Sequence, residues 1–181
     1  MWALSTACRC CLELKKNTVD VRDAYTNNYT DYLDTIPHLF YYNAFLILSN
    51  GTEAKVGTLG SKYEFFHEWK RLSEQDQGSV ALETMLRGIC KKENFLDLLE
   101  NFILYDHSGG HTAKILARNH QYLGVNEAVK AYEGRKLNNG KLGVFWHTQG
   151  SGKSYSMVFL AQKIRRKFAG SPTIVVLTDR D

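Results

Sequence analysis

The stretch KLGVFWHTQGSGKSYSMVFLAQKIRRKF, residues 141–168, constrains the fold of this 181-residue chain more than any other segment. Its apolar run 142–146 is rich in strand-forming residues and is typical of a buried parallel strand. A glycine-rich segment follows, and then apolar residues recur at helical spacing with basic residues on the opposite face. A second apolar run, 173–178, predicts another strand, so we expect a right-handed βαβ unit.

The glycine-rich segment has the composition of a phosphate-binding loop. Gly150 and Gly152 allow backbone angles that are closed to other residues and let an anion lie against the main chain. The loop N–H groups and the positive end of the following helix then point at the phosphates. Lys153 is placed to reach the β- and γ-phosphates, and the Ser154 hydroxyl to complete the Mg²⁺ shell. The predicted nucleotide-binding residues are Thr148, Gln149, Gly150, Ser151, Gly152, Lys153 and Ser154.

One position departs from the full motif G-x-x-x-x-G-K-[ST]. The motif has glycine five residues before Gly152, where this chain has His147. A glycine-rich turn with an incidental lysine is the alternative interpretation. The strand, helix and second strand expected around the loop favour nucleotide binding.

Upstream, the pattern mixes strands and helices. We expect a strand at 11–15, CLELK, and a helical stretch at 21–33. Asn50-Gly51 lies between two strand-forming runs and predicts a hairpin with a type I′ turn. Helical spacing then predicts helix over 79–105 and, after a loop, over 113–133.

Charge and composition exclude few classes of protein. The net charge of +4 is compatible with a nucleic-acid partner but does not require one. No apolar run approaches 18 residues, so no membrane span is expected. Cys8, Cys10 and Cys11 lack the spacing of zinc ligands, and Cys90 is distant in the sequence, so we expect free thiols in a reducing cytoplasm.

The residues GVFWHTQGSGKSYSMVFLA and TIVVLTDRD closely resemble motifs I and Ia of the R subunit of type I restriction enzymes, which are ATP-driven DNA translocases of helicase superfamily two. His147 is a usual residue in that family. ILARNHQYLGVNEAV, 115–129, resembles its adenine-sensing segment. The resemblance implies that Gln121 hydrogen-bonds the adenine edge with Arg118 nearby, and that ATP and Mg²⁺ are the cofactors. Considered alone, Gln121 fits a solvated helix residue better.

The resemblance continues towards the N-terminus. IPHLFYYNAFLILSNGTEAKVGTL and EFFHEWK are similar to the region that links nuclease and motor, and LELKK lies where the family carries the E-x-K of a PD-(D/E)xK nuclease. It implies that Glu13 holds Mg²⁺ and that Lys15 polarises the scissile phosphate or orients water. On a strand both side chains point to one face. An E-x-K considered alone fits a solvated strand edge better.

Two nuclease features depart from the family pattern. The family has a glutamine four residues before a tyrosine in the helix after E-x-K, whereas this chain has Asn28 and Tyr32. Tyr32 is therefore a candidate catalytic residue. Asparagine is one methylene shorter than glutamine, which argues against a DNA contact from Asn28. Residues 1–12 contain no Asp or Glu, so the expected second metal-binding carboxylate is missing.

The predicted fold class is α/β, with a partial PD-(D/E)xK nuclease-like domain followed by the first βαβ unit of a RecA-like P-loop motor domain. The predicted parts are the C-terminal part of the nuclease-like domain at 1–70, a helical connector at 71–112 and an incomplete helicase-like ATP-binding domain at 113–181. The resemblance implies double-stranded DNA and the modification and specificity subunits as partners. It also implies the cytoplasm of a bacterium or archaeon, and no membrane.

The family's Walker B acidic pair and its second motor lobe, which carries the arginine finger, are absent from this sequence. We therefore expect a truncated subunit that binds nucleotide weakly and neither cleaves nor translocates DNA alone. One alternative is another P-loop enzyme, such as a small nucleotide kinase, which needs a substrate-lid segment after residue 154. The other is a non-catalytic remnant or interaction module that docks to the modification or specificity subunits, for which Lys153 is dispensable.

Overall fold

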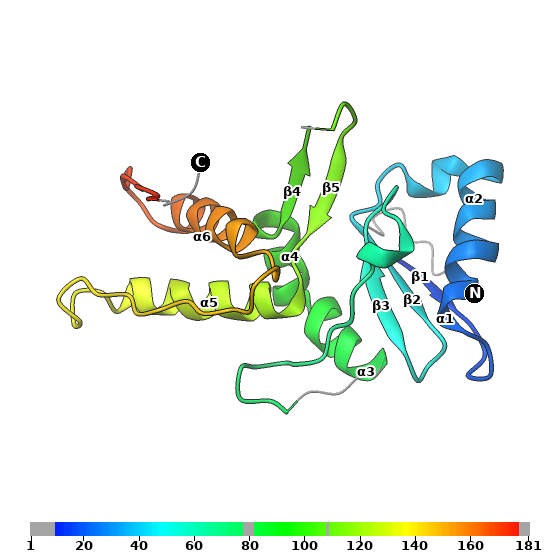
Figure 1. Ribbon diagram of the computed structural model, residues 1–181, viewed down its shortest axis with the longest axis horizontal. Coiled ribbons are helices and arrows are strands. Elements are labelled where there is room, and N and C mark those ends of the chain that lie inside the picture. Colours follow the sequence, from blue (N-terminus) through cyan, green and yellow to red (C-terminus); the bar gives the residue numbers. More distant parts are fainter. Residues whose placement is uncertain (1–9, 78–81, 108, 178–181) are drawn as a thin grey trace. The chain divides into compact units, whose positions relative to one another are not determined.

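The computed structural model describes residues 10–77, 82–107 and 109–177 (Figure 1). The chain divides into two compact units, residues 1–120 and residues 121–181. None of the described helices combines the length and the apolar character needed to cross a membrane.

A three-stranded sheet forms the centre of the first unit. β1 (Cys10–Leu14) pairs in parallel with β2 (Phe45–Ser49), and β2 pairs antiparallel with β3 (Ala54–Gly57). A parallel pair needs a long crossover between its strands. The helical elements of this crossover are α1 (Val21–Asp23), the π-helix η1 (Ala24–Tyr29), α2 (Thr30–Thr35) and the 3-10 helix η2 (Pro37–Phe40). The predicted strand at 11–15 and helical stretch at 21–33 are thus confirmed.

The crossover covers one face of this sheet and builds the core of the first unit. The buried residues of the cluster are Cys11, Val21, Ala24, Tyr29, Phe40, Leu46, Leu48 and Phe66. The Tyr29 ring meets Phe40 edge-on, with ring centroids 5.6 Å apart. Full burial of one large apolar side chain contributes about 1.5–3 kcal/mol, so this cluster is what fixes η1 and α2 over β1.

The predicted hairpin at Asn50-Gly51 is confirmed, but its type I′ turn is wrong. The ladder closes at Ser49 and Ala54, and within the loop between them only Gly51 has a positive φ, 87°. A type I′ turn needs a positive φ at two successive residues. The Asn50 side chain closes the loop instead, because its Oδ1 accepts hydrogen bonds from the N–H groups of Thr52 and Glu53 at 3.1 and 2.8 Å.

The next elements are the 3-10 helix η3 (Tyr63–Phe65), α3 (Leu82–Met85), the π-helix η4 (Leu86–Cys90) and α4 (Lys92–Asn101). The helix predicted over 79–105 is confirmed for much of its length but is wrong at its end, where β4 (Ile103–Asp106) forms. β4 pairs antiparallel with β5 (Ala113–Leu116), which is also a correction, because helix was predicted from 113. The loop between them brings two short apolar runs together, and their ladder satisfies backbone groups in pairs. Residues 79–81 lie outside the described part.

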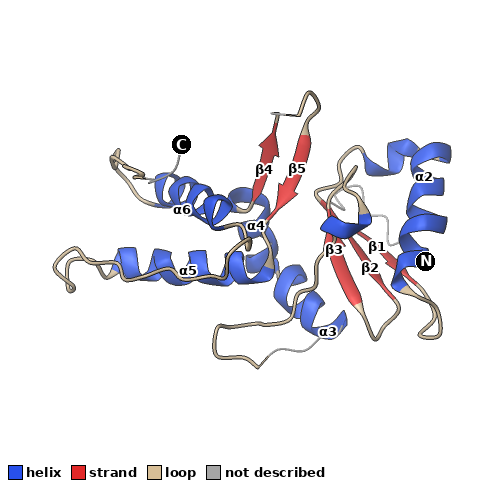
Figure 2. Ribbon diagram, in the orientation of Figure 1, coloured by secondary structure: helices blue, strands red, loops and turns tan. Residues whose placement is uncertain are grey.

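The regular structure of the second unit is helical. α5 (Asn119–Glu133) starts at the unit boundary, and α6 (Lys153–Lys167) confirms the helix predicted after the glycine-rich loop. The two flanking strands of the predicted βαβ unit are wrong within the described residues, since neither 142–146 nor 173–177 joins a ladder; both are loops in Figure 2. A strand that is apolar on both faces needs neighbours and cover on each side. Here Val144 and Leu177 are 94% and 92% exposed. Residue 178 lies outside the described part.

Polar contacts tie α5 to α6. The Lys163 Nζ, on a side chain that is almost fully buried, donates a hydrogen bond to Asn126 Oδ1 at 2.6 Å. Lys167 forms an ion pair with Glu133 at 2.7 Å. These contacts fix the helix that begins at the glycine-rich loop against the helix that carries Gln121.

Candidate functional site

The loop before α6 turns on two glycines in the left-handed region. Gly150 and Gly152 have φ values of 76° and 83°, which other residues adopt only at a cost of roughly 1–3 kcal/mol. Gly152 occupies the N-cap position of α6, whose first helical residue is Lys153. The first N–H groups of a helix have no intrahelical acceptor, and the helix dipole adds positive potential there. The loop therefore ends at a region of positive potential.

Lys153 folds back over this loop. Its Nζ donates hydrogen bonds to the carbonyl oxygens of His147 and Thr148, at 2.8 and 3.2 Å. The hydroxyl of Ser151 also donates to the Thr148 oxygen, at 2.7 Å. The loop thus closes around an ammonium group, and the exposed side chain of Lys153 remains accessible to an anion from solvent.

Gln121 lies against the same loop. Its side chain is 3% exposed, and its Nε2 donates to the Gly152 carbonyl oxygen at 2.9 Å. A Cβ atom on Gly152 would lie 2.6 Å from that nitrogen, so glycine is needed there for space as well as for φ. The structure therefore brings Gln121 to the loop backbone, and its contact with adenine stays a prediction.

The other predicted nucleotide-site residues include Gln149, Ser154 and Arg118. Gln149 and Ser154 are exposed. Arg118 belongs to the first unit, where its charge acts on His67. No group of three or more His, Cys, Asp or Glu side chains suited to a metal occurs in the part of the chain that the structure describes. Ser154 would therefore need phosphate oxygens and water to complete an Mg²⁺ shell.

The predicted nuclease residues lie at the end of β1. Glu13 is opposite Leu48 of β2, and the N–H of Lys15 donates to the Ser49 carbonyl oxygen at 2.8 Å. Glu13 is 9% exposed. Burial raises the pKa of its carboxyl group, and the nearby Lys15 ammonium partly opposes this shift.

Asn28 contacts Lys15, whereas the sequence argument considered it only for a contact with DNA. The Lys15 Nζ donates a hydrogen bond to Asn28 Oδ1, because η1 packs across the end of β1. The asparagine side chain reaches Lys15, and only the three-dimensional path of η1 shows this contact. Tyr32 is half-buried and packs against the hydrophobic core of the first unit.

The cysteines within the described residues, Cys10, Cys11 and Cys90, are free thiols. Cys10 and Cys90 are neighbours although they are distant in the sequence. A hydrogen bond with Cys10 lowers the pKa of the Cys90 thiol, while burial opposes that shift. Cys8 lies outside the described part.

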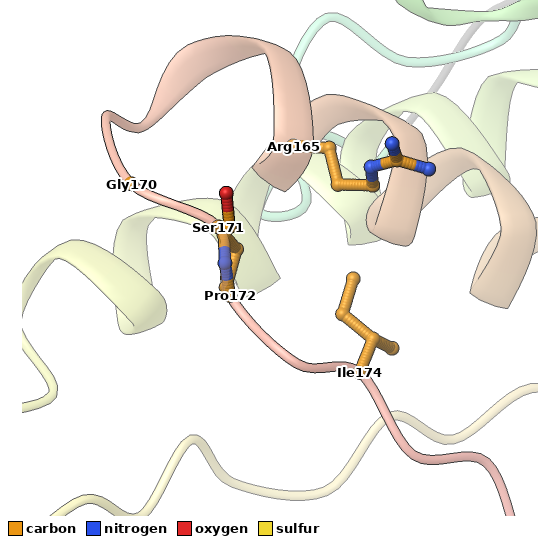
Figure 3. A pocket seen from close by; sticks show the side chains of 5 residues that line it. All are labelled: Arg165, Gly170, Ser171, Pro172 and Ile174. Atoms are coloured by element: carbon orange, nitrogen blue, oxygen red, sulfur yellow. The ribbon is translucent and has the colours of Figure 1, made fainter.

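A pocket of about 400 Å³ opens at the other end of α6, between Arg165, the turn at Gly170–Pro172 and Ile174 (Figure 3). A 15-residue helix is about 22 Å long, so this pocket is remote from the loop at Lys153. It is therefore not part of the predicted nucleotide site.

Comparison with known proteins matches two separate parts of the chain to two families. Residues 10–65 match the family "Type I restriction enzyme R protein N terminus", and residues 120–181 match the SWI2/SNF2 ATPase family. The chain is 38% identical over 175 residues to the type I restriction enzyme HindI endonuclease subunit of Haemophilus influenzae, covering 92% of this chain and 16% of that protein.

A second relative is archaeal. The chain is 30% identical over 190 residues to a protein of Methanocaldococcus jannaschii assigned as the type I restriction enzyme MjaIXP endonuclease subunit. The match covers 91% of this chain and 18% of that protein, so the chain spans less than a fifth of the length of either relative. By these similarities the chain belongs to the family of type I restriction enzyme R subunits and corresponds to their N-terminal region.

Proposed function

We propose that this chain binds ATP with Mg²⁺ at the loop 148–154. The observation that carries the proposal is the loop geometry, in which two left-handed glycines lead into the N-terminus of α6 and fold around the Lys153 ammonium group. Loop N–H groups, a helix N-terminus and a lysine are the three elements with which P-loop proteins hold phosphates. The match of residues 120–181 to an ATPase family supports the same ligand.

In this proposal Lys153 leaves the carbonyl oxygens of His147 and Thr148 and turns to the β- and γ-phosphates. An ammonium–phosphate contact joins two opposite charges. It is therefore stronger than the hydrogen bonds to two neutral carbonyl oxygens that it replaces. The Ser154 hydroxyl oxygen would be a ligand of Mg²⁺, and phosphate oxygens would supply further ligands. Gln121, already at the loop, contacts the adenine edge.

We extend the proposal to the intact R subunit, in which this region would serve ATP-driven translocation and cleavage of double-stranded DNA. Glu13 would hold Mg²⁺ and Lys15, positioned by Asn28, would face the scissile phosphate. The burial that raises the pKa of Glu13 disfavours the charged form of its carboxyl group. A bound metal ion or the Lys15 ammonium group would stabilise that charged form. With one carboxylate at that position, we expect no DNA cleavage from this chain alone.

The partners proposed for the region are double-stranded DNA and the modification and specificity subunits of a restriction complex. A purely interacting role, in which the chain docks to those subunits without nucleotide, is the competing function. It predicts that Lys153 is dispensable.

The test is calorimetric titration of ATP, with and without Mg²⁺, into the full chain and into Lys153→Ala. Lys136→Ala is a matched control, because it removes an exposed lysine of the same unit away from the loop. Binding that Lys153→Ala abolishes and Lys136→Ala leaves intact supports the proposal. A folded wild-type chain that binds no ATP refutes it and favours the docking role.

A further inference from the structure

Gly124, one turn after Gln121 in α5, faces the chain segment that enters the phosphate loop. A Cβ atom built on Gly124 would lie 2.6 Å from Cε2 and 2.8 Å from Cζ of Phe145. Real Cβ atoms do not approach other carbon atoms so closely. The absent side chain thus forms a notch in α5 that receives the edge of the Phe145 ring.

The Phe145 ring is in turn packed on the loop itself. It meets the His147 imidazole edge-on, with centroids 4.5 Å apart and an interplanar angle of 62°. The missing Cβ of Gly124 would also lie 3.5 Å from His147 Nε2. The His147 carbonyl oxygen is the nearer acceptor of the Lys153 ammonium, at 2.8 Å. A contact chain therefore runs from Gly124 through Phe145 and His147 to Lys153.

The other end of the loop rests on the same helix, because Gln121 donates to the Gly152 carbonyl oxygen. Two positions one turn apart on α5 thus hold the beginning and the end of the loop. Since α5 is a continuous helix, the separation of these two contacts is fixed.

We propose that Gly124 is a positioning residue for the phosphate loop. By seating Phe145 against α5, it places the His147 carbonyl, and hence the Lys153 ammonium, at the separation from Gly152 that a triphosphate requires. The inference rests on the proposed nucleotide binding, and it adds a residue that no loop motif contains.

The test compares two Gly→Ala substitutions associated with one helix. Gly124→Ala drives a methyl group into the Phe145 ring. Gly134→Ala, just after α5, is the matched control, because its Cβ meets nothing closer than 3.8 Å. Alanine is favoured over glycine in helices, so helix propensity alone would make Gly124→Ala stabilising. A loss of stability or of ligand affinity in Gly124→Ala would therefore come from the altered packing.

Two readouts separate loop position from general stability. The first is the set of backbone amide chemical shifts of 148–154 without nucleotide, and the second is the affinity for inorganic triphosphate and for Mg²⁺-ATP. Gly124→Ala should move the loop shifts and weaken both ligands about tenfold, the size expected of overpacking. Gly134→Ala should do neither.

The rescue variant is Gly124→Ala with Phe145→Ile, which removes the ring atoms that the new methyl group meets. It should restore both readouts towards wild type, and it serves as the test if Gly124→Ala alone does not fold. Loop shifts unchanged in Gly124→Ala, or unrestored by Phe145→Ile, overturn the inference. Loop shifts that move in a chain that binds no triphosphate would instead show that the proposed function fails while the positioning contact is real.

Discussion

Single residues in this chain carry properties that their neighbours impose, and His67 is the clearest example. Burial lowers the pKa of His67 to about 4, and the positive charges of Arg118 and His120 add to this shift. Two backbone hydrogen bonds, with Phe65 and Ala117, act in the opposite direction. The native state therefore holds a neutral imidazole where the unfolded chain would accept a proton.

His67 should make the first unit sensitive to acid. Its folded pKa lies below the unfolded value of 6.5, so its destabilising effect is absent above pH 6.5 and grows as the pH falls towards 4. The free energy of unfolding falls by about 1.4 kcal/mol per pH unit over this range, or by about 3 kcal/mol in total. Urea unfolding of His67→Gln between pH 4 and 7 should show a flatter profile than wild type, whereas the exposed His38→Gln should not. If the free energy of unfolding depends on pH in the same way in wild type and in His67→Gln, the lowered pKa of His67 is contradicted.

Gly88 should not tolerate alanine. A Cβ atom on Gly88 would lie 2.5 Å from Cδ1 of Trp69, a ring that is 2% exposed. Overpacking at such a site costs about 1–3 kcal/mol. Denaturant midpoints of Gly88→Ala and of Gly109→Ala, whose Cβ meets nothing closer than 3.4 Å, measure the difference. Equal midpoints would show that Trp69 moves aside freely.

Between helices, the partly buried Lys163–Asn126 contact joins α5 to α6. Removing one partner deletes a hydrogen bond to the ammonium group of a largely buried side chain, which costs about 1–3 kcal/mol, whereas replacing both by apolar groups is closer to neutral. Lys163→Met and Asn126→Leu should therefore each destabilise the chain more than the double variant does. A thermal-unfolding cycle that is strictly additive would mean that the hydrogen bond contributes nothing.

The elements that the sequence predicted correctly are those set by local pattern. The helix after Lys153 follows from its own apolar spacing, and the Asn50-Gly51 hairpin from adjacent runs. β4 and β5 were missed because their ladder depends on pairing across an intervening loop, which helical spacing does not encode. The predicted strands at 142–146 and 173–177 failed for the converse reason, since a buried strand exists only where other strands cover it.

In the candidate site too, the sequence predicted what local pattern sets and missed what depends on contacts between distant segments. Loop chemistry at Gly150, Gly152 and Lys153 follows from residue type and spacing, and the structure gives these residues the expected backbone. The contact of Asn28 with Lys15 depends on how η1 crosses β1. The Gly124 notch depends on the Phe145 ring, which lies five residues before Gly150, the first loop glycine. An isolated glycine inside a predicted helix was the available signal for the notch.

At the scale of the whole molecule, several large apolar side chains of the second unit are exposed to solvent. Val144, Trp146, Val175 and Leu177 are each at least 75% exposed. Extended apolar segments with unpaired backbone groups promote association between chains. We expect concentration-dependent sedimentation of wild type and a smaller dependence for Val144→Lys with Val175→Lys. A wild-type chain that remains monomeric at all concentrations would contradict this expectation.

The central claim is that the loop around Lys153 binds a nucleoside triphosphate. Equilibrium dialysis of ATP with Mg²⁺ against the full chain, wild type beside Lys153→Ala, tests it most directly. The account predicts saturable binding by wild type, and at least about tenfold weaker binding once a charge-assisted phosphate contact is removed. Equal binding by the two folded chains would place any nucleotide away from this loop, and no binding by wild type would leave the loop geometry without the proposed function.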